Sequence, residues 1–515
     1  MVQYMDNQSG FNQWNKINAK KPSKFSGFLW WLVLFLFAWW IMGAWFKPQN
    51  TEIKEVAPIT IEQSNVVKRN IANNDISFDV QGLRVSNVSL NKHKKESNSD
   101  EHIALLSDTN NFVEIGFVSS DVSVPNINTH WEMKSGEMHW DNPSVHFTRK
   151  ISVNGYVVSI TDIIKNKTNH EINVAPYVLI TESANNKSVS AVETGGVVYA
   201  NSNLDYINWN KLNKKSFAYS SVDASFGFAE QYWETVASTS AKDQTISLKK
   251  SGDLYFAQTN AAPVKIASKG ESEINTYLFA GPRQSDVLNA ASHNIPGISK
   301  TMDYGWFWFF AQPMLWMLNW LYALVGNYGI AIILMTLILR LLIWPLTRKS
   351  YVSTMAMQKM QPEMQRVQKL YANDKARLQM EMMKIYQTHK TSPMSGCLPM
   401  LIQIPIFFAL YKALIISVPM RSAHFLWISD LAVMDPYFIL PILMGLTMWL
   451  QQYLQSPKQT STTNDIAAST QRAMKWMPIL FTVMFAWMPA GLVLYWTVSN
   501  IFGIGQMYVI KKTTK

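Results

Sequence analysis

Arg340 is the residue of this sequence that is hardest to explain by packing alone. It stands inside the apolar run from Tyr328 to Leu346, and no long apolar run of the chain contains an Asp, a Glu or a His that could neutralise it. A charge near the centre of a bilayer is costly, so it persists where it faces water, a partner or a substrate. About 9 Å of helix separates Arg340 from Leu346, so the side chain could also extend to the nearer interface. The sequence leaves both interpretations open.

Other polar residues interrupt the apolar runs. Lys412, near the end of the run from Leu398 to Val418, is a second cation whose position favours extension to the interface. Thr336 precedes Arg340 by four residues, so the two share one face of a helix. Uncharged polar groups in these runs either bond between helices or line a hydrated groove together with Arg340: Thr336, Gln403, Gln451, Gln452, Thr482, Tyr495, Ser499 and Asn500.

The chain lacks the sequence motifs of several kinds of catalytic and cofactor-binding sites. It has neither a G-x-x-x-x-G-K-[ST] motif for nucleotide phosphates nor an H-E-x-x-H motif for zinc. The apolar runs contain no His or Asp that could support intramembrane proteolysis. The single cysteine, Cys397, allows no intrachain disulfide. We therefore expect a protein that is not an enzyme and that needs no cofactor or metal.

The net charge of +11 is unevenly distributed. Residues 51–300 contain 23 Lys and Arg against 27 Asp and Glu, a net charge of −4, which leaves +15 for the other residues. This basic excess flanks apolar runs, as the orientation signals of membrane proteins do. The sequence also lacks a nucleic-acid-binding motif, so we expect no direct nucleic-acid partner.

The first apolar run, residues 25–46, is long enough to cross a bilayer. Four lysines between residues 16 and 24 precede it, which places residues 1–24 in the cytoplasm as a polar leader. A cleavable signal peptide is the alternative, but Lys47-Pro48 follows the run in place of a small-residue cleavage site. We expect this first span to remain as a signal anchor, with the next residues outside the cytoplasm.

Residues 47–300 have the pattern of β-strands. Val113, Ile115 and Phe117 alternate with other residues, as do residues of the stretch 145–153. Asn154-Gly155 is the dipeptide of a two-residue type I′ hairpin. The sequence predicts one large all-β sandwich, and the topology places it on the outer side of the membrane.

Residues 301–325 are rich in aromatic side chains and contain Pro313, a composition that suits an amphipathic helix lying in the interface. A full span is the alternative, but it would reverse every later loop. Residues 347–395 hold nine Lys and Arg against three acids and are therefore expected in the cytoplasm. Apolar residues at helical spacing, with Pro362 opening a helix, predict a helical hairpin there, whose Met face either packs on itself or docks a partner.

The remaining spans complete the fold class. Both termini are expected in the cytoplasm. The predicted fold class is a polytopic α-helical membrane protein with six transmembrane helices, of which five form the core, and a large all-β sandwich. The spans after the β domain are residues 326–346, 396–418, 437–455, 475–488 and 489–510. They are joined by an outer loop at 419–436 and a cytoplasmic loop at 456–474, and a cytoplasmic tail follows at 511–515.

Five short runs of the chain resemble the YidC family of membrane protein insertases. They are Gly396-Cys397-Leu398-Pro399, Gln403-Ile404-Pro405-Ile406-Phe407, Leu426-Trp427-Ile428-Ser429-Asp430-Leu431, Asp435-Pro436-Tyr437-Phe438-Ile439-Leu440-Pro441 and Gly491-Leu492-Val493-Leu494-Tyr495-Trp496. The likeness extends over about residues 326–510. The large outer domain is similar to that of the Gram-negative form.

The resemblance implies a hydrophilic groove that is open to the cytoplasm and to lipid but closed to the outside. Arg340 matches the groove arginine of the family, and Thr336 and Gln403 match groove positions. Tyr495 and Trp496, which end the last motif, are assigned to the same substrate groove. Relatives commonly have a second tyrosine where this chain has Trp496.

The resemblance also implies a function and partners. It implies an insertase and folding chaperone of the bacterial inner membrane, which acts alone or beside the Sec translocon and carries a periplasmic domain. The partners would be nascent membrane proteins, the lipid bilayer, and the ribosome or the signal recognition particle machinery at the cytoplasmic hairpin. A small-solute transporter or channel would also need a polar site within the membrane, but the sequence shows no inverted repeat.

Overall fold

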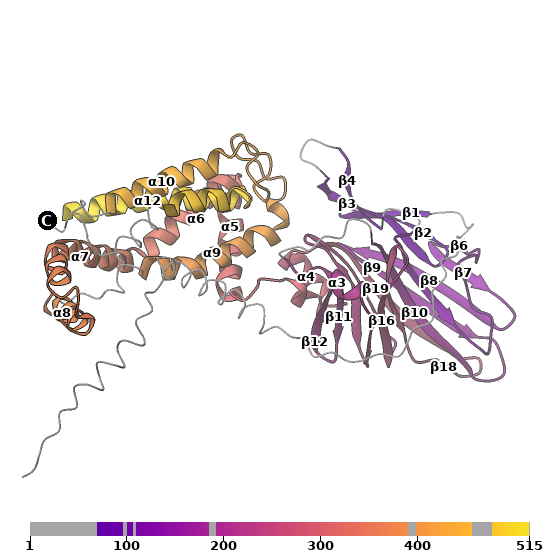
Figure 1. Ribbon diagram of the computed structural model, residues 1–515. Helices are drawn as coiled ribbons and strands as arrows, with labels where there is room; N and C mark the ends of the chain where they lie inside the picture. The colour runs from indigo at the N-terminus through magenta and orange to yellow at the C-terminus, as the bar shows by residue number, and fades with distance from the viewer. Residues whose placement is uncertain are drawn as a thin grey trace, which may run out of the picture.

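The computed structural model describes residues 69–95, 100–106, 110–184, 192–389, 398–455 and 476–513. The leader at 1–24, the first span at 25–46 and the loop at 456–474 were predicted in segments outside these residues. Figure 1 shows a β sandwich at one end of the molecule and a group of helices at the other. The predicted division into a β domain and a helical part is confirmed for the described residues.

The β domain is built from two antiparallel sheets. The first sheet has the order β1 (Arg69–Ala72), β2 (Ile76–Gln81), β3 (Arg84–Lys94), β5 (Val113–Val118), β10 (Ile172–Ser183), β17 (Leu254–Asn260), β16 (Gln244–Ser251) and β13 (Phe217–Ser221), with β4 (His102–Leu105) on β3 and β18 (Val264–Ile266) on β10. The second has the order β12 (Asn203–Asn208), β11 (Gly195–Ala200), β14 (Ala224–Ala229), β15 (Trp233–Thr239), β19 (Glu271–Pro282), β9 (Val157–Asn166), β8 (Val145–Asn154), β7 (Glu137–Asp141) and β6 (Glu132–Lys134). Three short helices, α3 (Trp209–Leu212), α4 (Ser285–Ala291) and η1 (Ile298–Thr301), complete the domain.

The hairpin between β8 and β9 confirms the predicted strand pair but shifts its turn by one residue. Asn154 pairs with Val157 as the last rung of the ladder, so the loop consists of Gly155 and Tyr156. Of these two, only Gly155 has a positive φ, of 56°. A positive φ at the first loop residue alone fits a type II′ turn, in which glycine occupies that position, and not the predicted type I′ turn.

A charged pair lies in the core of the sandwich. Arg149 on β8 donates from Nε to Asp162 Oδ1 on β9 at 2.7 Å, and both side chains are 1% exposed. Arg149 Nη2 also donates to the carbonyl of Ile115 on the opposite sheet at 2.9 Å. The pair therefore joins the two layers, and it persists in the core because each charge has a partner with good geometry.

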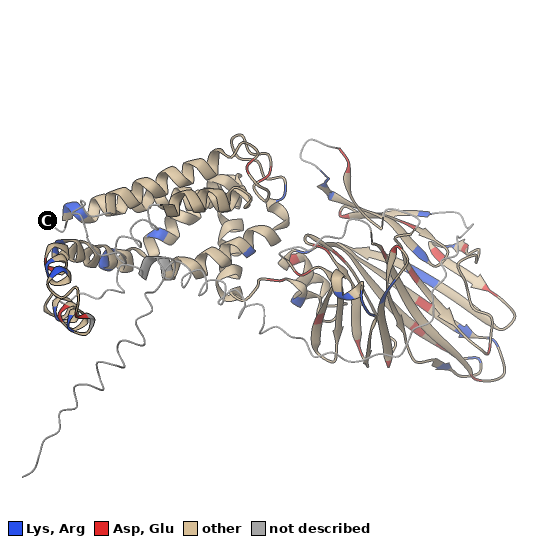
Figure 2. Cartoon of the chain, viewed as in Figure 1, with Lys and Arg blue, Asp and Glu red and all other residues tan. Residues whose placement is uncertain are grey.

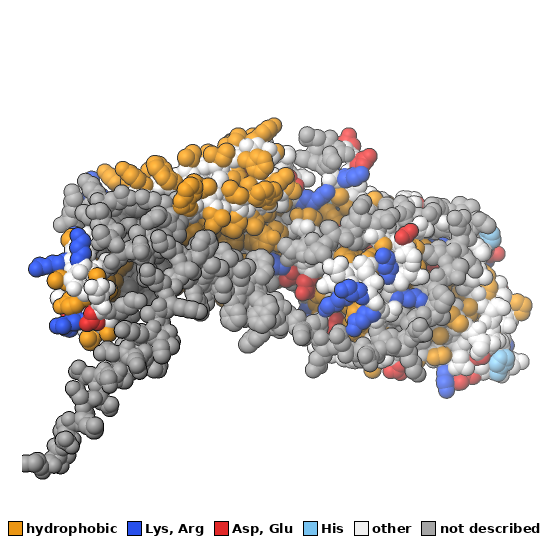
Figure 3. Space-filling model, viewed as in Figure 1, with side chains coloured by type: hydrophobic (Ala, Val, Ile, Leu, Met, Phe, Trp, Pro, Cys, Tyr) orange, Lys and Arg blue, Asp and Glu red, His pale blue; other side chains and the backbone are white. Residues whose placement is uncertain are grey.

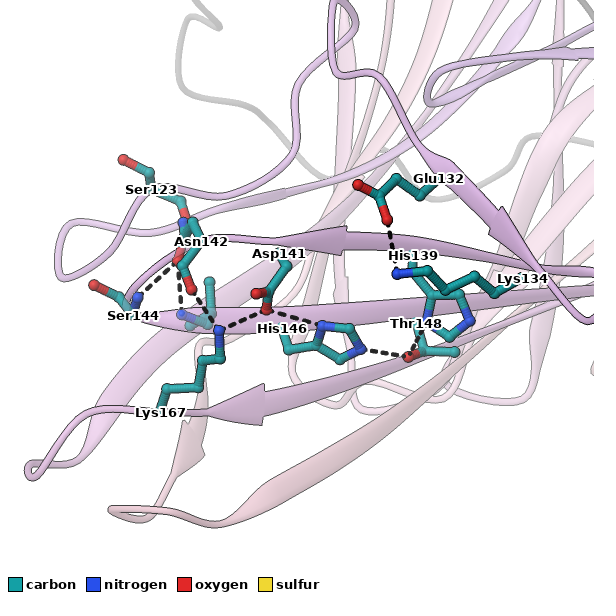
Figure 4. A network of polar contacts seen from close by, with 11 residues as sticks. Ser123, Glu132, Lys134, His139, Asp141, Asn142, Ser144, His146, Thr148 and Lys167 are labelled. Carbon is teal, nitrogen blue, oxygen red and sulfur yellow. Dashed lines mark hydrogen bonds and ion pairs between the residues drawn. The ribbon is translucent and has the colours of Figure 1, made fainter.

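Polar side chains form a network near the β6 edge of the second sheet, where β6 carries the exposed pair Glu132 and Lys134 (Figure 4). His146 Nδ1 and Lys167 Nζ lie 2.9 Å and 2.6 Å from Asp141 Oδ1. Hydrogen bonds from Lys167 and His146 hold the pKa of Asp141 below its ordinary value. Charged side chains at an edge discourage pairing with another strand.

A buried polar cluster lies where the chain leaves the sandwich. Arg283, 2% exposed, donates from Nη1 to the carbonyl of Glu193 at 3.0 Å and from Nη2 to Tyr206 Oη at 2.9 Å and to the carbonyl of Thr301. Glu234 Oε1 accepts from Thr301 Oγ1 at 2.9 Å, and Glu234 Oε2 lies 3.6 Å from Arg283 Nε. Burial raises the pKa of the Glu234 carboxyl to about 7. Sandwich strands and the exit segment η1 are thus held together by buried groups.

The helical part begins with α5 (Trp308–Val325), and its other helices are α6 (Tyr328–Leu342), α7 (Trp344–Leu370), α8 (Lys375–Thr388), α9 (Leu398–Ile416), α10 (Ile439–Gln455), an apolar helix Trp476–Phe485, and α12 (Ala490–Thr513). A short turn η3 (Val418–Met420) follows α9. Helix α12 packs on α6, α9 and α10, and α5 packs on α6 and α9. In Figure 1, α5 runs across the direction of α10 and α12.

Several predicted boundaries are corrected by the structure. Residues 344–346, assigned to the span 326–346, belong to α7, because Pro345 at the start of that helix begins a new axis bent by 64° from α6. Pro362 lies inside α7 and does not open a helix. The helical hairpin is formed by α7 and α8. Helix α12 continues to Thr513, beyond the predicted limits of the last span at 489–510.

The described residues contain one helix, α12, that is long and apolar enough to cross a membrane, or two if the bent pair α6 and α7 forms one span. Figure 2 shows that Lys, Arg, Asp and Glu are frequent on the sandwich and on the hairpin of α7 and α8, while α10 and α12 are nearly free of them. Figure 3 shows an apolar surface over the helical part. On α10, four exposed residues at helical spacing contribute to it: Ile442, Leu446, Trp449 and Tyr453.

Candidate functional site

Arg340 lies in the last turn of α6, and its side chain is directed towards α12. It is half-buried, and its Nε donates to Ser499 Oγ on α12 at 2.8 Å. Within the described ranges, no Asp or Glu forms an ion pair with it. The guanidinium therefore faces the interior of the helical part and has a neutral partner there, so the contact with α12 favours the interior interpretation over extension to the interface.

Gln403 and Tyr495 form a second polar contact on the same face of α12. Gln403 Nε2 on α9 donates to Tyr495 Oη at 2.7 Å. Tyr495 is buried, and it lies one helical turn before Ser499, the partner of Arg340. Tyr495 and Ser499, two of the polar residues singled out in the sequence, thus lie on one face of α12, and Ser499 contacts Arg340 there.

Two residues expected at the polar site have other surroundings. Thr336 is fully buried, and its hydroxyl donates to the carbonyl of Ile332 in its own helix at 2.6 Å. Trp496 packs its ring on Phe407 and Phe485, with centroids 5.5 Å and 5.0 Å away. Consecutive residues of a helix point about 100° apart, so Trp496 cannot share the face of Tyr495. It belongs to an aromatic cluster between α9, Trp476–Phe485 and α12.

The prediction missed Gln506, Gly503 and Tyr351 at this site. Gln506 on α12 donates from Nε2 to the carbonyl of Arg340 at 3.2 Å. A Cβ atom at position 503 would lie 3.7 Å and 3.8 Å from Arg340 Nη1 and Nη2, so the guanidinium rests against the glycine. Tyr495, Ser499, Gly503 and Gln506 are spaced by four, four and three residues, a helical-face pattern that could have identified them.

Polar contacts continue from this site towards the hairpin. Gln451 and Gln455 on α10 each donate an amide N–H to Tyr351 Oη on α7 at 3.4 Å. Gln358 Nε2 on α7 donates to the carbonyl of Gln455 at 2.5 Å. Helices α7 and α10 are thus joined by side-chain amides next to the Arg340 site.

Lys412, the second cation of the apolar runs, has a different environment from Arg340. Its Nζ lies 2.5 Å from Asp303 Oδ2, in the segment that joins the sandwich to α5. Near this pair, Gln231 Nε2 of the sandwich donates to the carbonyl of Ile415 at 2.9 Å. Lys412 therefore helps to hold α9 against the β domain, and its charge is neutralised.

The described residues offer no group of three or more His, Cys, Asp or Glu side chains that could hold a metal ion. The polar site consists of one guanidinium, amides and hydroxyls. These groups can bind polar or anionic parts of another molecule through hydrogen bonds and charge.

The chain thus combines a large β sandwich with apolar helices that enclose polar side chains. The sequence model of the family described as 60Kd inner membrane protein matches residues 320–515, and that of the YidC periplasmic domain matches residues 71–317. The chain is 34% identical over 521 residues to the membrane protein insertase YidC of Rickettsia bellii (strain OSU 85-389), covering 91% of this chain and 92% of the relative. It is also 34% identical to that of Rickettsia canadensis (strain McKiel), with coverage of 89% and 90%. The chain belongs to the YidC family of membrane protein insertases.

Two solved structures are similar at lower identity. A crystal structure of an active YidC insertase with its first transmembrane domain resolved matches with 18% identity and a TM-score of 0.39, covering 86% of this chain and 92% of that chain. A galactose mutarotase related enzyme from Lactobacillus acidophilus matches with 9% identity and a TM-score of 0.30, covering 42% of this chain and 97% of that chain.

Family membership decides between the two functions considered for the sequence. The protein is an insertase of the inner membrane with a periplasmic domain, it acts on membrane proteins, and it is not an enzyme.

Proposed function

We propose that the insertase receives the polar tail of its client in a hydrophilic groove centred on Arg340. The supporting observation is the contact of its Nε with Ser499 at 2.8 Å, made without an acidic partner among the described residues. A cation that is partly removed from water and not neutralised attracts an acidic segment more strongly than a solvated one does. Gln403 and Tyr495 would add hydrogen-bonding groups to this groove.

The apolar segment of the client would leave the groove for lipid along α9 and the helix Trp476–Phe485. The aromatic cluster of Phe407, Phe485 and Trp496 lines this side, and Figure 3 shows an apolar patch on one face of the helical part. Transfer of an apolar helix from a polar groove to lipid is favourable because its surface is removed from water. This difference in free energy would drive release of the client into lipid without nucleotide hydrolysis.

The arrangement in the membrane is part of the same proposal. Six spans, with both termini in the cytoplasm, would place the sandwich in the periplasm and the hairpin of α7 and α8 in the cytoplasm. The hairpin would meet nascent chains, the ribosome or the signal recognition particle machinery. The protein would act alone or beside the Sec translocon.

The test is insertion of a short client with an acidic outer tail into liposomes that contain only the purified full-length protein. Arg340→Ala should lower the insertion rate about tenfold, because it removes roughly one moderate charge contact with the client. Arg340→Lys keeps the charge and should keep most of the insertion rate. Arg348→Ala, which removes an exposed cation of α7, is the matched control and should insert at the parent rate. Equal rates for Arg340→Ala and the parent would refute the role of Arg340 in the groove.

A further inference from the structure

The loop between α9 and α10, residues 421–438, is bonded to the end of the helical part that faces the sandwich (Figure 1). The backbone N–H of Ala490, at the start of α12, donates to the carbonyl of Val433 at 2.7 Å. Asn327, the N-cap residue of α6, donates from Nδ2 to the carbonyl of His424 at 3.2 Å. The loop is therefore a fixed part of this end of the structure.

The buried carboxylate of Asp435 holds the second half of the loop. Its Oδ1 accepts from Trp427 Nε1 at 3.0 Å and from the backbone N–H of Tyr437 at 3.1 Å. Its Oδ2 accepts from the backbone N–H of Leu440, in the first turn of α10, at 2.7 Å. A carboxylate at this position satisfies N–H groups that the start of a helix leaves unpaired. One side chain thus fixes the loop to α10.

Leu426 lies at a turn position that favours glycine. Phe425 and Ile428 exchange two backbone hydrogen bonds, of 2.8 Å and 2.9 Å, so Leu426 and Trp427 form a two-residue turn. Of these two, only Leu426 has a positive φ, of 54°, and a leucine adopts this conformation with strain. Its side chain is 71% exposed, so contacts with the described residues do not offset the strain. The turn holds a bulky apolar side chain away from the protein.

The rest of the loop also exposes apolar side chains, and α10 continues this surface. Phe438, the last loop residue, has a positive φ of 56° as well. Apolar surface that is exposed over several neighbouring residues is unfavourable in water and marks a site of contact. The exposed apolar residues are Val433, Met434, Tyr437 and Phe438 in the loop, followed by Ile439 and Ile442 on α10.

The neighbouring helix α5 indicates which partner covers this surface. It ends at Val325, two residues before Asn327, which bonds to the loop. Trp316 and Trp320 on α5 are exposed, and α5 runs across the direction of α10 and α12 (Figure 1). Exposed aromatic side chains on a helix of this orientation suit the surface of a bilayer. The protein belongs to the inner membrane, so lipid is the apolar partner available at this end.

We propose that the loop 421–438 binds lipid at the boundary between headgroups and acyl chains of the outer leaflet, and that Leu426 enters the acyl side of this boundary. The proposal rests on the proposed arrangement in the membrane and is independent of the groove at Arg340. Because the loop is bonded to α6, α10 and α12, it fixes the depth at which the outer ends of these helices meet the lipid.

The lipid contact is tested with a nitroxide label on the full-length protein in liposomes of phosphatidylethanolamine and phosphatidylglycerol. In a Cys397→Ser background, a label on Leu426→Cys is probed with oxygen, which concentrates in the bilayer, and with a water-soluble nickel complex. Ile442→Cys on α10 and Val222→Cys on the sandwich are matched controls, because both native side chains are 55% exposed. The ratio of oxygen to nickel accessibility at 426 should be close to that at 442 and several-fold above that at 222.

Three results would overturn the proposal. A ratio at 426 equal to that at 222, with a high ratio at 442, would remove the lipid contact and leave the arrangement in the membrane. Low accessibility to both reagents at 426 would show that protein covers the loop. A ratio at 442 as low as that at 222 would overturn the arrangement in the membrane and the lipid contact with it. None of these results depends on Arg340.

The role of Leu426 itself is tested with the label moved to Val433→Cys. Leu426→Asn keeps a residue that tolerates positive φ and removes the apolar side chain, so the accessibility ratio at 433 should fall several-fold. Ser429→Asn, at an exposed position of the same loop, should leave the ratio at the parent value. Leu426→Asn should also melt no lower than the parent, which shows that the loop is still folded. An unchanged ratio in Leu426→Asn would overturn the assignment to Leu426.

Discussion

Glu234 makes the stability of the periplasmic domain depend on pH. Burial raises its pKa from the ordinary value of 4.5 to about 7 in the folded domain. Between these two values the folded state holds the proton more firmly than the unfolded state, so the free energy of unfolding falls as pH rises. The contribution is complete below pH 4.5 and is lost above pH 7. At 1.36 kcal/mol per pKa unit, the difference amounts to about 3 kcal/mol.

The groups that face Glu234 also fix the sign of this effect. Arg283 and Thr301 favour its charged form, but burial outweighs them. Within the described residues, Arg283 Nε has no hydrogen-bond partner although it lies only 3.6 Å from the carboxylate. A second acid of this region, Glu193, also has a raised pKa, because it is buried and lies near the charge of Asp303. Net burial of negative charge is therefore unfavourable at this cluster.

The measurement is the melting temperature of the full-length protein in detergent, followed by the signal of the β domain from pH 5 to pH 8. A change of about 3 kcal/mol should lower the melting temperature of the parent by roughly 6–12 °C across this range. Glu234→Gln keeps the shape and removes the titration, so its curve should be nearly flat. Glu271→Gln, an exposed position on β19, should follow the parent. Equal slopes for Glu234→Gln and the parent would refute the assignment to Glu234.

Three further predictions concern stability and the joint between the two parts. Arg149→Met should destabilise the sandwich by about 3–5 kcal/mol because it leaves Asp162 buried and unpaired, and Arg149→Met with Asp162→Leu should recover much of this loss in denaturant titrations. Phe147→Ala should cost about 3–5 kcal/mol, since the ring is fully buried; a loss below 1 kcal/mol would contradict the packing. Asp303→Asn should expose the segment before α5 to limited proteolysis, because Lys412 loses its partner at 2.5 Å, whereas unchanged cleavage would show that the pair does not hold the joint.

The sequence was sufficient where the relevant pattern is local. Alternating residues predicted the strands, and the asymmetry of charge separated the β domain from the helical part. Arg340, Gln403, Tyr495 and Ser499 could be singled out because a polar group in an apolar helix must find a partner, and each of them has a polar partner in the structure. Thr336 was assigned to the same site by its spacing from Arg340 and by the family resemblance, but a threonine hydroxyl can bond to its own helix, and here it does so.

The rest of the structure depends on contacts between distant residues. Arg283 and Glu234 meet only when β15 and β19 pair, and neither residue has a local signal that distinguishes it from a surface charge. The same holds for Arg149, whose bond to the carbonyl of Ile115 requires both sheets. The predicted turn at Asn154-Gly155 was displaced by one residue because the pairing of β8 and β9 sets the register, and a dipeptide cannot fix it alone.

Lys412 and Arg340, the two cations of the apolar runs, differ in their partners, and this difference bears on which of them could attract a client. Lys412 lies 2.5 Å from Asp303, and this pair cancels its field near the β domain. Arg340 is given only a neutral hydroxyl and the backbone of a glycine, so its charge is not cancelled by any acid among the described residues. In the proposed groove, an acidic tail that reaches the contact of α6 with α12 would therefore meet a cation that no acid among the described residues neutralises. In the proposed groove, a second free cation near the β domain would offer a competing endpoint, so the ion pair of Lys412 with Asp303 would contribute to selectivity together with the charge of Arg340.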